Sequence, residues 1–150
     1  MSTASPSVTP NKKTLKLLVV TPEKVVLEEV VDFVALPLID GELGVLPGHQ
    51  PIVGRLNHGE LRVRTGTITR AYFVDGGFVQ VKPGLVTVLT SRSMAAAGLD
   101  SESANRDLEL AASRPATTLK DRQDKDRVLA RARALKRLAA KTSNRKTTSA

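Results

Sequence analysis

The 150-residue chain contains no cysteine, no tryptophan and only two histidines, His49 and His58. Without thiols it can form neither disulfides nor zinc–thiolate sites, and it has no cysteine nucleophile. Two histidines are also too few for a histidine-rich metal site. We therefore expect a protein that works without a bound metal or other cofactor.

Aromatic residues and long apolar runs are also scarce. Three phenylalanines and one tyrosine are present, so the core must be built from valine, leucine and alanine. No apolar run approaches the roughly 20 residues that a membrane-spanning helix needs. The first residues lack the basic and then apolar pattern of a secretory signal. These absences favour the cytoplasm as the location.

Charge is distributed unevenly along the chain. Residues 1–119 contain 12 basic and 12 acidic residues, whereas residues 120–150 contain 11 basic residues and three aspartates. The net charge of +8 therefore belongs entirely to the last 31 residues. A neutral body with a cationic tail indicates an anionic partner for the tail.

Residues 14–91 have the pattern of an all-β domain, after a polar segment (1–13) that we expect to be disordered. Short Val-rich runs alternate with turn residues at spacings near ten, which is typical of a sandwich or barrel. The runs are Leu15 to Val20, Val25 to Leu27, Phe33 to Leu36, Leu61 to Val63, Ala71 to Val74, Phe78 to Val81 and Leu85 to Leu89. Turns are predicted at Asp40-Gly41, Thr65-Gly66, Asp75-Gly76-Gly77 and Pro83-Gly84.

Residues 100–141 predict two helices after a linker at 92–99. Asp100 is a suitable N-cap for the first helix, and Pro115 ends it. Thr118 can cap the second helix, with Asp121 at the capping-box position. The second helix is expected to end near Lys141, and 142–150 to form a disordered tail. The short connection makes an antiparallel hairpin.

The apolar stripe of each predicted helix is narrow and mostly alanine. The stripes are Ala104, Leu108, Ala111 and Ala112 in the first helix, and Val128, Ala132, Leu135 and Ala139 in the second. A buried leucine contributes roughly 1.5–3 kcal/mol and an alanine far less. We therefore expect the hairpin to dock weakly, so that it can exchange between positions.

Residues suited to catalysis are few. His49 and His58 are both predicted to lie in turns, where a lone histidine is commonly a surface residue. The carboxylate pairs Glu28-Glu29 and Asp40/Glu42 are expected to be solvated. No phosphate-binding Gly-rich loop occurs. A small enzyme on a β-sandwich is therefore disfavoured.

The second helix is strongly basic outside its apolar stripe, through Arg127, Arg131, Arg133, Lys136, Arg137 and Lys141. A solvated face, a nucleic-acid surface, a membrane-surface helix and a contact with an acidic protein are all compatible with this charge. No aromatic stacking residues accompany the stripe, and alanines rather than large apolar residues lie opposite. Residue chemistry alone leaves these alternatives open.

The run Asp40-Gly41-Glu42-Leu43-Gly44-Val45-Leu46-Pro47-Gly48-His49-Gln50-Pro51 resembles the signature loop of the epsilon subunits of F-type ATP synthases. Further motifs resemble the same family in the same order: Val20-Thr21-Pro22-Glu23, Gly59-Glu60-Leu61-Arg62-Val63, Asp75-Gly76-Gly77-Phe78-Val79-Gln80-Val81 and Val86-Thr87-Val88-Leu89. The resemblance is strong over residues 14–91. Over residues 99–141 it lies mainly in the architecture.

The resemblance implies a ten-stranded β-sandwich followed by a C-terminal helical hairpin. It implies a non-catalytic central-stalk subunit that couples ion-driven rotation to ATP synthesis, lying peripherally on the cytoplasmic side of the inner membrane and associating with it only through the complex. The implied partners are the gamma subunit, the c-subunit ring and the alpha and beta subunits of the catalytic head, with no nucleic acid. By resemblance, Glu42 and His49 face the c ring.

The resemblance also assigns a regulatory role to the hairpin, which in bacterial members can extend into the head and oppose ATP hydrolysis. Arg127, Arg131, Arg133, Lys136 and Arg137 match that role by charge. Some relatives bind ATP through a Leu/Ile-Asp-x-x-Arg-Ala run. Here Asp100 matches but Ser103 replaces the arginine, and serine cannot replace a guanidinium against phosphate. No nucleotide site is therefore predicted. The alternative function is a basic nucleic-acid-binding module.

Overall fold

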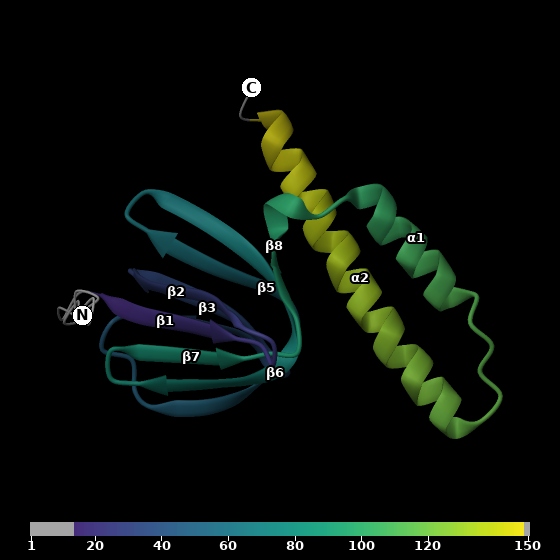
Figure 1. The fold of residues 1–150 in the computed structure, drawn as a ribbon, viewed down its shortest axis with the longest axis horizontal. Helices are drawn as coiled ribbons and strands as arrows, with labels where there is room; N and C mark the ends of the chain where they lie inside the picture. Colours follow the sequence, from purple (N-terminus) through teal and green to yellow (C-terminus); the bar gives the residue numbers. More distant parts are fainter. Residues whose placement is uncertain (1–13, 149–150) are drawn as a thin grey trace, which may run out of the picture.

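The computed structural model describes the backbone of residues 14–148 and the side chains of residues 14–142. The predicted disordered lead-in at 1–13 lies outside the described residues. The elements are β1 Leu15–Val20, β2 Val25–Val31, β3 Phe33–Leu38, β4 Gly41–Val45, β5 Ile52–Thr65, β6 Ile68–Lys82, β7 Leu85–Leu89, β8 Ser93–Ala95, the 3-10 helix η1 Ala96–Gly98, α1 Ser101–Ala112 and α2 Leu119–Thr148. A β domain is followed by two helices, as predicted (Figure 1).

The strands form one continuous eight-stranded sheet in the order β2-β1-β7-β6-β5-β3-β4, with β8 also pairing β6. Neighbouring strands are antiparallel except for β1 and β7, which run parallel. The sheet folds over a single core of buried Leu and Val side chains, because alternate residues of each strand point inward. Leu15, Leu17 and Val19 of β1 show this alternation, each being at most 1% exposed.

The expected count of ten strands is wrong for the described residues 14–148, which contain eight. The reason is the length of β5 and β6, which have 14 and 15 residues and pair from Ile52 opposite Val81 to Thr65 opposite Ile68. Each of these strands curves across the fold (Figure 1). Each therefore takes the place of two shorter strands in the expected count.

The turn predicted at Asp75-Gly76-Gly77 is also wrong, because these residues lie inside β6. Positive φ angles are present, at 69° for Gly76 and 108° for Gly77, but they bend the strand instead of reversing it. The pairing with β5 passes from Leu56 opposite Gly77 to His58 opposite Asp75. A Cβ at Gly77 would lie 1.9 Å from the Leu89 carbonyl oxygen, so only glycine fits this crossing.

Two short strands were not predicted. Gly41–Val45, expected as part of a loop, forms the edge strand β4 against β3. The expected linker 92–99 contains β8 and η1, and β8 pairs with β6. The β domain therefore extends past residue 91.

The predicted caps of the hairpin are confirmed. The Asp100 carboxylate accepts a hydrogen bond from the Glu102 backbone N–H at 3.1 Å. The Thr118 hydroxyl accepts from the Asp121 N–H, and the Asp121 carboxylate accepts from the Thr118 N–H, as a capping box requires. α1 ends at Ala112, three residues before Pro115.

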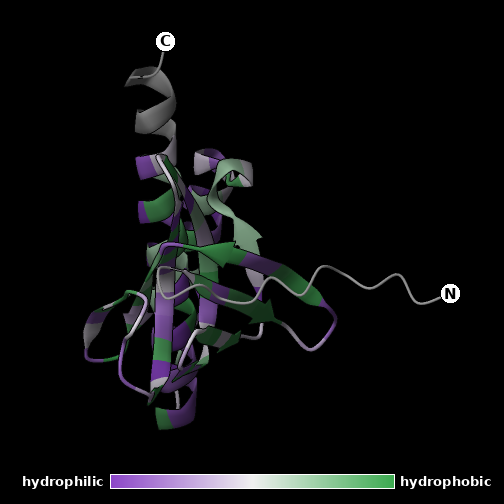
Figure 2. Ribbon diagram, turned by 90° about the vertical axis from the view of Figure 1, so that its left-hand side faces the viewer, coloured by the Kyte–Doolittle hydropathy of each residue, from purple (hydrophilic) through white to green (hydrophobic). Residues whose placement is uncertain are grey.

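The predicted end of the second helix near Lys141 is wrong. α2 continues to Thr148, through most of the expected tail. No glycine or proline occurs between 141 and 148 to end it. The coloured part of α2 in Figure 2 carries both hydrophilic and hydrophobic residues. Within residues 14–148, no helix is long and apolar enough to cross a membrane.

Candidate functional site

The hairpin packs on the sandwich through a small apolar cluster, which we call the docking cluster. Its buried members are Phe73 of β6, Ala96 of η1, and Ala134 and Leu138 of α2. Phe73 is completely buried and Leu138 is 3% exposed. Because only one leucine and one alanine of α2 are buried here, the apolar contribution to docking is modest, on the order of 2–4 kcal/mol.

Two faces of α2 are buried, one against α1 and one against the sandwich. The sequence indicated only the face against α1. Val128, Ala132 and Leu135 belong to the predicted stripe and line a cavity with Leu110 and Ala111 of α1. The sandwich-facing side consists of Arg131, Ala134, Leu138 and Lys141, at i, i+3, i+7 and i+10. Its only signal in the sequence is an alanine and a leucine four residues apart beside the main stripe, which is too short to stand out.

Two ion pairs flank the docking cluster. Arg131 Nη1 lies 3.0 Å from Asp75 Oδ2, and Lys141 Nζ lies 2.9 Å from Glu60 Oε2. Both carboxylates are largely buried, with side chains 8% and 17% exposed, and both cations are about two-fifths exposed. A largely buried carboxylate needs such a partner, because its desolvation is costly when it is unpaired.

The Glu60 carboxylate is only partly satisfied. Its second oxygen, Oε1, is buried and has no hydrogen-bond partner among the described residues. A buried acceptor without a partner costs roughly 1–3 kcal/mol. This cost offsets part of the docking energy.

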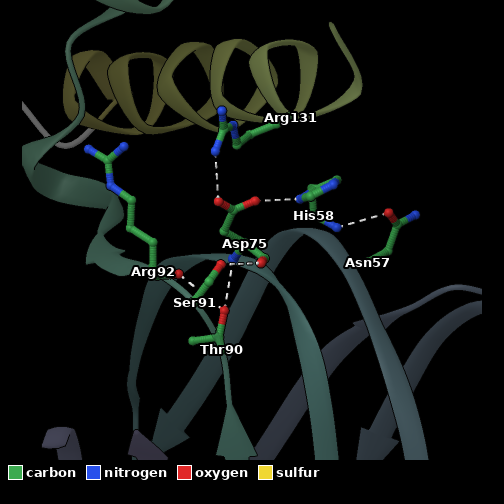
Figure 3. Close-up of polar contacts among 7 residues, drawn as sticks. All are labelled: Asn57, His58, Asp75, Thr90, Ser91, Arg92 and Arg131. Atoms are coloured by element: carbon green, nitrogen blue, oxygen red, sulfur yellow. Dashed lines mark hydrogen bonds and ion pairs between the residues drawn. The ribbon is translucent and has the colours of Figure 1, made fainter. Parts of the chain in front are cut away.

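Asp75 is held in place by the segment that leads into the hairpin (Figure 3). Its backbone N–H donates to Thr90 Oγ1 at 3.1 Å and to the Arg92 carbonyl at 3.0 Å, and Ser91 Oγ donates to the Asp75 carbonyl at 2.9 Å. The bend of β6, the exit from β7 and helix α2 thus meet at one residue. A movement of α2 at this point would change the ion pair between Arg131 and the Asp75 carboxylate.

His58 also faces Asp75. Its Nδ1 lies 2.6 Å from Asp75 Oδ1, and its side chain is 21% exposed (Figure 3). The prediction of a turn histidine is wrong, because His58 lies within β5 opposite Asp75. One carboxylate therefore faces an imidazole on one oxygen and a guanidinium on the other.

The five basic residues predicted to contact the head do not form one cluster. Arg131 pairs with Asp75, and Arg127 Nη2 approaches Asp124 at 3.9 Å within the same helix. Arg133, Lys136 and Arg137 are exposed, and none has an acidic partner among the described residues. Three cations thus remain available while the hairpin is docked.

The two residues predicted to face the c ring lie close in sequence at one edge of the sheet. Glu42 is on the edge strand β4, 57% exposed, and forms an ion pair with Arg62 of β5. His49 follows in the turn after β4, where its N–H donates to the Leu46 carbonyl at 3.1 Å. Pro47 and Pro51 fall on either side of it. Both side chains thus belong to a stiff edge of the fold.

Asp100 and Ser103, which fall at positions of the nucleotide-binding run of some relatives, have other surroundings here. The Asp100 carboxylate is used as the N-cap of α1, and Ser103 is exposed on the first turn. Among residues 14–148, no three His, Asp or Glu side chains are grouped so as to hold a metal ion.

Comparison with known proteins shows a consistent relationship. Residues 14–96 match the family model described as "ATP synthase, Delta/Epsilon chain, beta-sandwich domain". An ATP synthase epsilon chain from Rhodopirellula baltica is 45% identical over 119 residues, which are 79% of this chain and 93% of that one. One from Syntrophobacter fumaroxidans is 43% identical over 131 residues, 85% of this chain and 97% of that one.

A solved structure supports the same relationship over more of the chain than the family model matches. A chain of the Euglena gracilis mitochondrial ATP synthase, from a structure of its OSCP, F1 and c-ring, superposes with a TM-score of 0.75 at 26% identity, covering 82% of this chain and 79% of that one. The β-sandwich, the two helices and the sequence identity agree, and the chain belongs to the family of ATP synthase epsilon subunits.

Proposed function

We propose that this subunit is a non-catalytic part of the central stalk that couples ion-driven rotation of the c ring to ATP synthesis in the head. The sandwich binds the gamma subunit and rests on the c ring. The subunit is held at the cytoplasmic face of the inner membrane through the complex alone. The family match over residues 14–96 carries this proposal, because it spans the whole sandwich including β8.

The contact with the c ring is assigned to Glu42 and His49. Neither residue belongs to the docking cluster or to its two flanking ion pairs, so the assigned contact uses other side chains than the docked hairpin. Replacing both with alanine should weaken coupling, measured as ATP-driven ion transport by the reassembled complex, while leaving ATP hydrolysis by the isolated head unchanged. Unimpaired transport would remove these two residues from the interface.

The hairpin acts as a switch that restrains ATP hydrolysis when it leaves the sandwich. Its five basic residues, Arg127, Arg131, Arg133, Lys136 and Arg137, then contact acidic surfaces of the alpha and beta subunits. The docked form holds Arg131 on Asp75, so that this residue cannot serve both contacts at once. Docking therefore opposes inhibition.

The decisive experiment is ATP hydrolysis by a purified αβγ head, with the full chain or with a form ending at Leu99. Truncation at Leu99 keeps β8 and η1, which pack on β6, whereas an earlier end near Arg92 would remove them. Inhibition by the full chain alone is expected. Equal activity with both forms would reject the switch, and failure of both forms to bind would reject the central-stalk assignment.

A nucleic-acid-binding role gains no support. Arg131 and Lys141, two of the basic residues of α2, are paired with carboxylates of the sandwich. The relatives described above are subunits of ATP synthases.

A further inference from the structure

The Asp75 carboxylate carries one negative charge and faces two groups that can be cationic. Its Oδ2 lies 3.0 Å from Arg131 Nη1, and its Oδ1 lies 2.6 Å from His58 Nδ1 (Figure 3). The Asp75 side chain is 8% exposed, so solvent ions do little to screen its charge from either partner. One carboxylate can therefore neutralise the guanidinium or a protonated imidazole, but it cannot neutralise both.

The 2.6 Å contact determines which ring nitrogen of His58 titrates. Two lone pairs at this distance would repel each other, so a proton is assigned to Nδ1, which donates it toward Asp75 Oδ1. Nδ1 is buried, and no other polar group among the described residues forms a hydrogen bond with it. A second proton must therefore bind at Nε2, and the ring then becomes an imidazolium.

The surroundings of His58 already contain an excess of positive charge. His58 lines a cavity of about 470 Å³ between the sandwich and the hairpin. The other charged side chains that line it are Asp75 of β6, Arg114 of the α1–α2 connection, and Asp124, Arg127 and Arg131 of α2. Three arginines thus face two aspartates, and an imidazolium would raise the excess from one positive charge to two.

The charged groups next to this cavity do not offset that excess. The adjoining cavity between α1 and α2 adds Arg92 and Asp107, which are of opposite charge. On β5, the next residue on the same side as His58 is Glu60, which is already paired with Lys141 at 2.9 Å. A proton on His58 therefore has only Asp75 to neutralise it.

Docking of the hairpin and protonation of His58 oppose each other for this reason. In the docked state Arg131 is paired with Asp75, so an imidazolium would have no carboxylate of its own. When the hairpin leaves, Arg131 leaves with it, and Asp75 can neutralise the imidazolium alone. The released state therefore favours the proton, so docking is strongest at high pH and is lost as pH falls. An ordinary imidazole changes charge between about pH 5 and pH 8, which is the physiological range.

We propose that His58 makes docking of the hairpin sensitive to pH, because a proton on its imidazole replaces the Arg131 guanidinium as the partner of Asp75 and releases α2. The effect on docking follows from contacts within this chain. Its consequence for ATP hydrolysis rests on the proposed function, in which the released hairpin inhibits the head. Acidification should then strengthen that inhibition.

The test measures hydrogen exchange of the α2 backbone in the full chain at about pH 7.5 and about pH 5.5, across the range in which imidazole titrates. Exchange is expressed as protection relative to an unstructured peptide at the same pH, which removes the pH dependence of the chemical step. Protection of α2 should be at least ~5-fold lower at the lower pH, while the sandwich strands stay protected.

Two histidine variants show whether His58 is responsible. His58→Gln keeps an N–H for Asp75 but cannot gain a charge, so its protection should differ by less than about twofold between the two pH values. His49→Gln is the matched control in the free chain, because His49 is the other histidine and lies in the turn after β4. It should keep the wild-type response. A His58→Gln chain that also keeps the full response would overturn the inference.

A second measurement does not depend on the folding of a His58 variant. NMR titration of the His58 imidazole in Arg131→Gln should give a protonation midpoint at least ~0.5 pH unit above that of the wild type, because the competing guanidinium is gone. An unchanged midpoint would overturn the inference, and so would wild-type protection that is equal at both pH values.

The outcomes for docking and for hydrolysis separate this inference from the proposed function. Inhibition of the αβγ head is compared with the head alone at each pH. If docking responds to pH as expected and inhibition does not strengthen on acidification, the inference stands and the proposed switch is wrong. If the full chain inhibits the head and docking does not depend on pH, the inference is wrong and the proposed function stands.

Discussion

Arg131 of α2 and Asp75 of β6 are 56 residues apart in the chain, and they meet in an ion pair of 3.0 Å. The arginine belongs to the basic set proposed to contact the catalytic head, and the aspartate is fixed by the segment that leads into the hairpin. Under the proposed switch, the docked and the extended hairpin therefore compete for the same guanidinium. A change at Asp75 acts on this competition without altering the basic surface of the helix.

Asp75→Asn should loosen the docked hairpin, because Arg131 loses its charged partner. With a largely buried carboxylate and a half-exposed arginine, we expect a coupling of about 1–2 kcal/mol, between the values for exposed and buried pairs. A double-mutant cycle with Arg131→Gln, followed by hydrogen exchange of the α2 backbone, measures it. Asp124→Asn is the control, since its 3.9 Å contact with Arg127 is exposed. Equal exchange in both variants would contradict the role of the pair.

Leu138→Ala should release the hairpin more strongly, because Leu138 is the one large apolar side chain of α2 that is fully buried in the docking cluster. Such replacements cost about 2–5 kcal/mol, here toward the lower end because the hairpin can separate instead of leaving a cavity. Exchange along α2 should rise while the sandwich strands stay protected. In the αβγ head assay, the variant should inhibit ATP hydrolysis more than the wild type.

Leu119→Ala is the matched control, since Leu119 is 71% exposed at the start of the same helix. It should leave exchange and inhibition unchanged. If Leu138→Ala inhibits less than the wild type, then docking does not oppose inhibition, and the proposed switch is wrong in direction.

Features governed by local chemistry were predictable from the sequence. The Asp100 cap, the Thr118–Asp121 capping box and the end of α1 before Pro115 each depend on residues within one or two turns. The same holds for the hairpin turn at Gly66, where φ is 60°. The inward alternation of Leu15, Leu17 and Val19 follows from the period of a strand.

Features that depend on distant partners were not predictable. The residues Gly76 and Gly77 have the local chemistry of a turn, and only the pairing of β5 with β6 keeps them inside a strand. Likewise, Ala134 and Leu138 are buried because Phe73 lies beneath them, 61 and 65 residues away. Neither the β5–β6 pairing nor the packing on Phe73 produces a periodic pattern in the sequence. The docking cluster and the role of Asp75 could therefore be found only in the structure.

Gly77→Ala tests whether the bend of β6 needs glycine. The added Cβ would lie 1.9 Å from the Leu89 carbonyl oxygen at a φ of 108°, so the backbones of β6 and β7 must separate. We expect a loss of at least ~3 kcal/mol in the free energy of unfolding, measured by urea denaturation. Gly66→Ala is the control, with a φ of 60° and open space around it, and should lose only about 1 kcal/mol. Equal losses would mean that the close approach at Gly77 does not constrain the fold.

The capping box at the start of α2 predicts a specific dependence on pH. Hydrogen bonds from the Thr118 side chain and then from its backbone hold the pKa of Asp121 below its ordinary value. A lowered pKa in the folded state means that the carboxylate stabilises the helix start at pH values above the ordinary pKa. This contribution is lost as pH falls through the lowered pKa.

Thr118→Ala should raise the pKa of Asp121, as followed by NMR titration of its carboxyl group. Thr117→Val should raise it less, because Thr117 makes the weaker contribution. Because Asp121 is the acidic residue in the first turn of α2, its protonation should also increase hydrogen exchange at the Thr118 and Asp121 amides before it affects the middle of α2. Exchange that rises uniformly along the helix would show that the cap does not control its start.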